Sequence, residues 1–326
     1  MKKIEFIGID VSSATLDVCI KIDGKRTSTV IKNKVLEIKK FFKPFENRNV
    51  VVAMENTGRY NWFLYEVLAE KPFFVYVIPP LHFKRSMGLV RGKTDKIDAV
   101  RIVDFIEKNY LEMTKWKCPS ISIQKLKVLL TERNYRVKLK RQLLVMQHDY
   151  KRMKKLNIDK TLISMNNELI NNAKKQIDII ENKIEELIKN DEKLNEQANL
   201  IRSIPGIGNV ISWYLIAKTN AFTSIDNPRK FACYCGIAPF EHQSGTSIYR
   251  KPQVSSFADK TMKSLLHLSS MTAIQRENDI REYYIRKVNE GKNKMSVLNA
   301  VRNKIIHRVY AVIKNKTFYK NNLVLS

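Results

Sequence analysis

The chain has 326 residues, of which 44% are hydrophobic, so it is long enough to form two domains that each bury a core. Its 59 Lys and Arg residues exceed its 32 Asp and Glu residues and give a net charge of +27, spread over the whole chain, which favours nucleic acid as a partner. Four scattered cysteines exclude a disulfide framework, and no apolar run is long enough for a signal peptide or a membrane span, so we expect a soluble cytoplasmic protein.

The first third of the chain alternates predicted strands and helices. Runs rich in β-branched and aromatic residues predict the strands, and Asp23-Gly24 predicts a hairpin turn. In chain order we expect strands at 4–11, 16–23 and 27–31, an amphipathic stretch at 35–45, a strand at 50–54, a helix at 60–69, a strand at 73–78 closed by two prolines, and a helix at 95–107. This order is typical of an α/β RNase H-like domain, which we assign to residues 1–118.

Residues 119–200 carry a pattern typical of long helices. Apolar residues recur at steps of three and four, interrupted at Asp191, and this heptad seam needs a second helix to cover it. The seam consists of Ile170, Ala173, Ile177, Ile180, Ile184, Leu187 and Leu194. A helix around Leu126 and Leu144 is the nearest one available. An internal hairpin and a seam between two subunits both satisfy the pattern, and we favour contact between subunits.

Residues 201–326 are expected to form a mainly α-helical domain. We expect helices at 228–235, 259–274 and 296–313, with a Ser/Gly/Lys-rich loop at 240–257. The segment 201–208 resembles a helix-hairpin-helix turn, in which Gly206 and Gly208 would let the backbone and the next helix N-terminus approach phosphates. The same Pro-Gly-x-Gly pattern also occurs in plain turns.

Four carboxylates fall where an RNase H-like sheet would bring them together. Asp10 ends the first strand and Glu55 ends the fourth, and these two strands are neighbours in such a sheet. Asp95 and Asp98 lie three residues apart, on one face of a helix. Converging carboxylates raise one another's pKa, and a hard divalent cation relieves this repulsion while it holds phosphate oxygens. The set therefore predicts a Mg²⁺ site, with Mn²⁺ as a possible substitute.

Each of these acids also has a purely structural interpretation. A strand-end Asp such as Asp10 often caps a turn. Asp95 could begin a helix, complement its dipole and be neutralised by Arg91, Lys93 or Lys96. Asp17 and Asp104 are left out of the predicted site, because the sequence does not place them at the end of a strand or beside the other acids.

Five motifs, in the same order along the chain, carry a resemblance to a known family. They are GIDVSS at 8–13, MENTG at 54–58, RGKTDKIDA at 91–99, IPGIG at 204–208, and GIAP at 236–239 followed by QSG at 243–245. Together they resemble the DEDD transposases of the insertion-sequence 110 group, and the resemblance extends over most of the chain.

This resemblance implies a RuvC-like domain at 1–118, a coiled-coil arm at 119–200 and a C-terminal transposase domain at 201–326. It implies that the four acids bind metal and that Ser244 is the nucleophile, which cuts and rejoins DNA through a phosphoserine. Family members work as multimers with a structured bridge RNA that pairs with target and donor DNA. Both DNAs, this RNA and a homo-oligomer (dimer or tetramer) are therefore the expected partners, in the nucleoid of a prokaryote. Tyr-Arg-Lys-Pro at 249–252 replaces the further glycines common in the family, which leaves the shape of this loop open.

Several basic residues near these motifs are candidate nucleic-acid contacts. They are Arg59, Arg85, Arg91 and Lys93 near the acids, and Arg250 and Lys251 behind Ser244. Tyr60 and Trp62 are interpreted as packing residues rather than base-stacking platforms. Two alternatives remain: a metal-dependent junction resolvase would use water in place of Ser244, and a non-enzymatic nucleic-acid scaffold would need neither the serine nor the metal.

Overall fold

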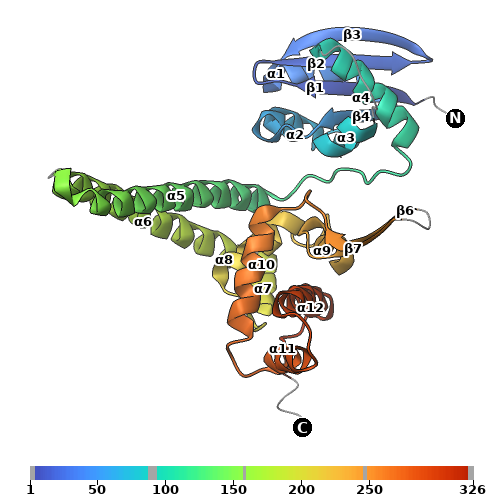
Figure 1. Ribbon diagram of the computed structural model, residues 1–326. Helices are drawn as coiled ribbons and strands as arrows, with labels where there is room; N and C mark the ends of the chain where they lie inside the picture. The colour runs from blue at the N-terminus through green and yellow to red at the C-terminus, as the bar shows by residue number, and fades with distance from the viewer. Residues whose placement is uncertain (1–3, 87–93, 157–158, 245–247, 322–326) are drawn as a thin grey trace. The chain divides into compact units, whose positions relative to one another are not determined.

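The computed structural model describes residues 4–86, 94–156, 159–244 and 248–321. The chain divides into two compact units, Met1–Cys118 and Pro119–Ser326, which are described one after the other (Figure 1). No helix in these described ranges combines the length and the apolar content that crossing a membrane requires.

The first unit is built on a five-stranded sheet of order β3-β2-β1-β4-β5. The strands are β1 (Glu5–Val11), β2 (Thr15–Ile22), β3 (Lys25–Lys32), β4 (Val50–Glu55) and β5 (Phe74–Ile78). The first three pair antiparallel, whereas β4 pairs parallel with both β1 and β5. Asp23 and Gly24 have φ angles of 48° and 80°, as the turn between β2 and β3 requires. The predicted α/β RNase H-like arrangement of this unit is confirmed.

Helices cover both faces of this sheet. They are α1 (Val35–Phe42), α2 (Trp62–Leu68), α3 (Pro80–Ser86) and α4 (Asp95–Asn109), with short 3₁₀ turns at Lys43–Phe45 and Gly58–Asn61. One core joins α1 and α2 to Ile7 and Ile9 of β1, and a second core joins α4 to the opposite face. The prediction contained no helix at α3, because we took Pro79 and Pro80 to close a strand. Pro80 instead begins the helix, where its missing N–H has no partner to lose.

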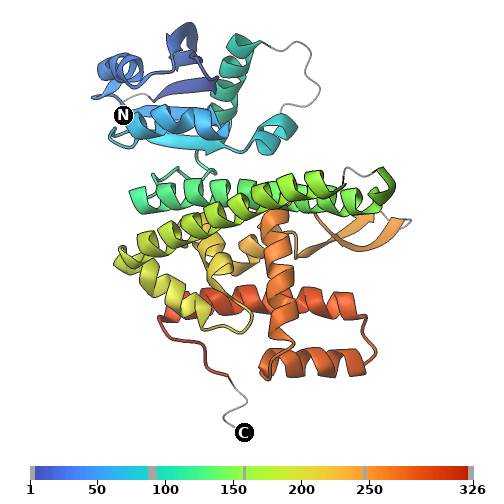
Figure 2. The same cartoon turned by 90° about the vertical axis from the view of Figure 1, so that its left-hand side faces the viewer.

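The second unit is mainly helical, as Figures 1 and 2 show. Its elements are α5 (Ile121–Arg152), a 3₁₀ turn at Lys154–Leu156, α6 (Asp159–Lys189), α7 (Glu192–Arg202), α8 (Asn209–Thr219), α9 (Pro228–Tyr234), β6 (Pro239–Ser244), β7 (Ile248–Val254), α10 (Lys260–Ala273), α11 (Asp279–Asn289) and α12 (Lys294–Asn315). The expected loop at 240–257 thus contains a β-hairpin. Residues 240–241 and 252–254, at the base of this hairpin, are all exposed, so at these positions no buried face imposes the alternation by which a strand is recognised in sequence.

The predicted heptad seam is covered within the chain. Ile170 and Ile184 on α6 are 4% and 0% exposed in a single copy. Helices α5 and α6 run antiparallel, since Arg133 pairs with Glu181 at 2.7 Å while Gln147 contacts Asn167 at 2.6 Å. The contact between subunits that we favoured for this seam is therefore wrong.

The seam also ends earlier than expected, because Asp191 accepts a hydrogen bond from the Leu194 amide at 3.1 Å and starts α7. Leu126 and Leu130 of α5 share one core with Ile201 and the helices that follow. The two segments that we assigned as separate domains, 119–200 and 201–326, thus pack as one unit.

We expect Ile184→Ala to lower the free energy of unfolding of the second unit by about 2–5 kcal/mol, because it leaves a cavity under α5. Ile179→Ala is the matched control on the same helix, since Ile179 is 55% exposed and its loss should cost well under about 1 kcal/mol. Urea unfolding followed by circular dichroism measures both. Equal costs for the two variants would show that α5 does not cover the seam.

Candidate functional site

Strand register brings Asp10 and Glu55 side by side. Ile9 pairs with Met54 in the parallel β1–β4 ladder, so the next residues along the two strands, Asp10 and Glu55, are neighbours on the same face. Ile9 and Met54 belong to the core under α1 and α2. Successive side chains alternate between faces, so both carboxylates lie on the face that α4 covers.

Helix α4 lies directly on β1 because residue 8 is a glycine. A Cβ atom at Gly8 would stand 2.7 Å from the Ala99 carbonyl oxygen and from the Val103 amide nitrogen, closer than a side chain can approach backbone. Ile102, Val103 and Ile106 are buried in the core on this side. The glycine therefore allows the contact that brings the first turn of α4 to the edge where β1 and β4 end.

Helix α4 begins with the two remaining acids. Thr94 is its N-cap and accepts a hydrogen bond from the Ile97 amide at 3.3 Å, so Asp95 is the first helical residue and Asp98 lies one turn later. Both acids complement the positive end of the helix dipole. Asp98 is also paired with Arg101 at 2.8 Å.

The other three carboxylates act electrostatically on Asp10. The pKa of Asp10 is raised from 3.8 to about 6, first by burial and then by the negative charges of Asp95, Asp98 and Glu55. The structure therefore brings the other three predicted acids within electrostatic reach of Asp10.

The donor set fits a hard divalent cation in its chemistry, because Mg²⁺ and Mn²⁺ prefer carboxylate oxygens. Among the residues that the structure describes, however, no three His, Cys, Asp or Glu side chains stand at metal-ligand spacing. In the metal-free protein, repulsion between the carboxylates keeps them further apart than metal ligands would stand, and the same repulsion contributes to the raised pKa of Asp10.

Sequence reasoning missed a fifth acid at this edge. Asp17 of β2 is the direct antiparallel partner of Asp10, and its pKa is raised by burial and by the charge of Asp95. The strand spacing could have identified it, because Val11 pairs with Leu16 across a short turn and the preceding pair is then Asp10 with Asp17.

The predicted nucleic-acid contacts of this unit divide into two groups. Arg59 and Arg85 are exposed, and the Arg59 guanidinium lies 5.2 Å from the centre of the Tyr60 ring. Arg91 and Lys93 lie outside the described residues. Tyr60 and Trp62 are 37% and 42% exposed, so neither belongs to a core, and their interpretation as packing residues rather than base-stacking platforms stays a prediction.

In the second unit, the two glycines of the predicted phosphate-binding turn differ in the space around them. Gly206 has a φ of 86° and a Cβ there would clash with the Ser269 carbonyl oxygen, so it is needed for packing against α10. Gly208 has open space around its Cβ position and precedes α8, whose first amides have no side-chain cap. Of the two, Gly208 is the one with open space beside it at a helix N-terminus, and the phosphate contact stays a prediction.

Ser244 is the last residue of β6, paired in register with Ile248 of β7. The backbone of this hairpin is described up to Ser244 and from Ile248, but the side chains of Ser244, Arg250 and Lys251 lie outside the described part. The base of the hairpin is held by Asn299 of α12, whose Nδ2 donates to the Ile237 carbonyl at 2.8 Å. The candidate nucleophile thus stands at the end of a strand tied to the helical core.

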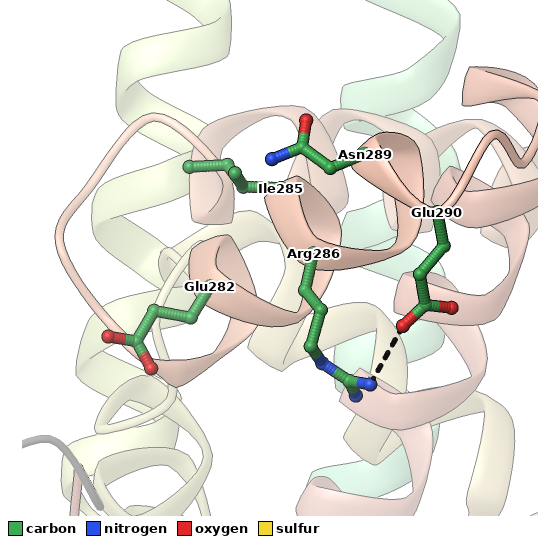
Figure 3. A pocket seen from close by; sticks show the side chains of 5 residues that line it. All are labelled: Glu282, Ile285, Arg286, Asn289 and Glu290. Carbon is green, nitrogen blue, oxygen red and sulfur yellow. Dashed lines mark hydrogen bonds and ion pairs between the residues drawn. The ribbon is translucent and has the colours of Figure 1, made fainter.

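A surface hollow on α11 is not a comparable site. It is lined by Glu282, Ile285, Arg286, Asn289 and Glu290 (Figure 3). Arg286 lies 3.0 Å from Glu290, and this ion pair offsets the positive charge that a phosphate would need.

Sequence comparisons match both units. Residues 7–148 match the family profile of the DEDD transposases of IS110, and residues 198–285 match the profile described as "Transposase IS116/IS110/IS902 family". The chain is 27% identical over 325 residues to the pilin gene-inverting protein of Moraxella bovis, covering 97% of this chain and 98% of the relative. It is 25% identical over 129 residues to an uncharacterized 44.8 kDa protein of insertion element IS116 from Streptomyces clavuligerus, covering 39% and 32%.

Among solved structures, RuvC of T. thermophilus in complex with a Holliday junction substrate aligns at a TM-score of 0.26 with 15% identity. The alignment covers 35% of this chain and 98% of RuvC.

We expect Gly8→Ala to destabilise the first unit by about 1–3 kcal/mol, because the added methyl group pushes α4 away from β1. Gly208→Ala is the control, since nothing lies within 4 Å of its Cβ position and its φ of −104° suits any residue. Thermal unfolding of both variants compares the effects. A Gly8→Ala protein as stable as the parent would show that α4 does not rest on this glycine.

The raised pKa of Asp10 predicts a pH-dependent effect of Asp10→Asn in metal-free protein. An acid with a folded-state pKa of about 6 and an ordinary value of 3.8 disfavours folding wherever it is charged, so the penalty is complete above about pH 6 and absent below about pH 4. Asp10→Asn should therefore raise the free energy of unfolding at about pH 7.5, and the gain should fade as the pH falls toward about 4. Urea titrations in EDTA at the two pH values measure this. A gain that is the same at both, or larger in acid, would contradict the assigned repulsion.

Proposed function

The chain belongs to the IS116/IS110/IS902 family of transposases, enzymes that recombine DNA, and we propose that it cuts and rejoins DNA with a metal site in its first unit and a serine in its second. The observation that carries the proposal is the grouping of Asp95, Asp98 and Glu55 around Asp10, whose pKa is raised first by burial and then by these three charges. The protein as a whole is strongly basic, which suits it to bind polyanions. The acids at one sheet edge form a local site that suits cations.

Asp10, Glu55, Asp95 and Asp98 would hold Mg²⁺, or Mn²⁺ in its place. When bound, the ion would offset the carboxylate repulsion and polarise a scissile phosphate. Asp10 and Glu55 would bind from the strand ends, and Asp95 and Asp98 from the first turn of α4. Exposed Arg59 and Arg85 would contact the backbone of the same DNA.

Ser244 would attack the phosphorus atom of one DNA strand. A bond forms between its Oγ and phosphorus as the hydroxyl gives up its proton, the bond from phosphorus to one deoxyribose oxygen breaks, and that oxygen leaves as a hydroxyl by taking up one proton, so that protons balance. The phosphoserine keeps the energy of the phosphodiester, so the strand can be joined to a new partner without ATP. Arg250 and Lys251, on the following strand, would steady the phosphate, and the Gly208 turn would bind DNA backbone.

Target DNA, donor DNA and a structured RNA that pairs with both are the proposed partners, all of them polyanions that a net charge of +27 favours. Two relatives are pilin gene-inverting proteins, and inversion of a DNA segment requires exchange at two sites. Exchange at two sites requires several active sites, so we propose a dimer or tetramer, working where the chromosomal DNA lies. Because the α6 seam is covered within the chain, the subunits would meet elsewhere.

The experiment that tests this function is capture of the serine adduct. With the RNA, Mg²⁺ and a nicked target that blocks resealing, the protein should become linked to a DNA end, and peptide mass spectrometry should locate the bond at Ser244. Ser244→Ala should lose the adduct and reduce recombination by at least about 10³-fold, as loss of a nucleophile commonly does. Ser255→Ala is the control and should retain both.

The acids are tested in the same assay. Asp10→Ala and Asp95→Ala should form no adduct yet still bind DNA, because they remove metal ligands and leave the basic surface intact. The parent protein could instead cleave DNA without forming an adduct, and Ser244→Ala could cleave equally well. These two results together would establish a metal-dependent nuclease that uses water in place of the serine. Full activity in EDTA would remove the metal from the mechanism.

A further inference from the structure

Two buried asparagines tie together the loops that follow the two strand-end acids. Asn61 is 0% exposed and Asn33 is 5% exposed, and both lie in the first unit. A buried amide side chain is costly unless it is hydrogen bonded, so the partners of such residues indicate what they hold in place.

Asn61 closes the loop directly behind Glu55. Its Nδ2 donates to the carbonyl oxygen of Glu55 at 2.9 Å. Its Oδ1 accepts from the Thr57 amide at 2.8 Å and from the Thr57 hydroxyl at 2.6 Å. Three hydrogen bonds from one rigid side chain therefore fix the backbone from which the Glu55 carboxylate projects.

Asn33 joins this loop to the one that follows Asp10. Its Nδ2 donates to the Ser12 carbonyl at 2.9 Å and to the Tyr60 carbonyl at 3.1 Å. Ser12 lies two residues after Asp10, and Tyr60 adjoins Asn61. A single amide group thus bridges the ends of β1 and β4 at the point where the strand ladder itself stops.

This bridge matters because the ladder that joins β1 to β4 stops before it reaches the two carboxylates, although each is paired with the strand on its other side, β2 for Asp10 and β5 for Glu55. Ile9 and Met54 are the last β1–β4 pair, and Asp10 and Glu55 stand one step further. Like charges at this edge push the two loops apart, and the two asparagines oppose that motion with neutral hydrogen bonds.

We propose that Asn33 and Asn61 are positioning residues that set the separation of Asp10 and Glu55 and thereby the affinity of this edge for a divalent cation. The inference rests on the proposed function. It adds to that function the residues that hold the backbone beside two of the proposed metal ligands. Residues that do not touch the metal but hold its ligands in place commonly weaken metal binding 10–100-fold when they are removed.

Binding of Mn²⁺ to the full chain, followed by electron paramagnetic resonance, tests the proposal without any assay of activity. Asn61→Ala should weaken Mn²⁺ binding about ten-fold or more, and Asn33→Ala should weaken it in the same direction. Thr57→Val removes only the hydroxyl donor to Asn61 and should give a smaller weakening. This milder variant, together with Asn33→Ala, keeps the proposal testable if Asn61→Ala fails to fold.

Asn278→Ala supplies the matched control. Asn278 is 2% exposed, and its Nδ2 donates to the Ala273 and Arg276 carbonyls at 2.8 Å each, but it lies in the second unit. Its loss should lower stability while leaving Mn²⁺ affinity unchanged, which separates a general loss of stability from an effect on the site.

Two results would overturn the proposal in distinguishable ways. If Asp10→Ala abolishes Mn²⁺ binding while folded Asn61→Ala and Asn33→Ala bind as the parent does, the asparagines do not position the ligands and the proposed function stands. If the parent and Asp10→Ala bind Mn²⁺ equally, the metal site of the proposed function fails as well.

Discussion

The contact between α4 and β1 at Gly8 is the constraint on which the first unit depends. Any side chain at this position would meet the Ala99 carbonyl oxygen and the Val103 amide, so only glycine lets the helix rest on the strand. The burial of Ile102 and Ile106 against the sheet follows from this approach, and so does the position of the first turn of α4. Two acids on that turn are thereby held beside two acids at the strand ends.

The arrangement carries an electrostatic cost that the fold does not remove. Asp10 shows it in a pKa near 6, caused by burial and by three neighbouring carboxylates, while Asp17 faces the same edge from β2. Arg101 offsets part of the charge of Asp98. Stability is thus lowered at the same place where we propose that a cation binds, as is common at functional sites.

The second unit has one continuous core in place of an independent arm and domain. Helices α5 and α6 bury the heptad seam between them, and Leu126 and Leu130 continue into the core around Ile201 and Trp213. The β6–β7 hairpin is attached to this core through Asn299 of α12, which donates a hydrogen bond to the Ile237 carbonyl just before β6. The helical framework therefore determines where the end of β6 lies within this unit.

The sequence by itself determined most of the order of strands and helices along the first unit, the Asp23-Gly24 turn, the start of α4 and the positions of the four acids at element ends, because each depends on local spacing that sequence periodicity and turn residues record. Only the tertiary structure decided that Asp17 stands opposite Asp10, that α5 covers the α6 seam, that Gly206 packs on α10, and that Asn33 and Asn61 join the loops behind the acids. These features depend on strand register and helix docking between residues far apart in the chain, and local propensity does not specify such contacts.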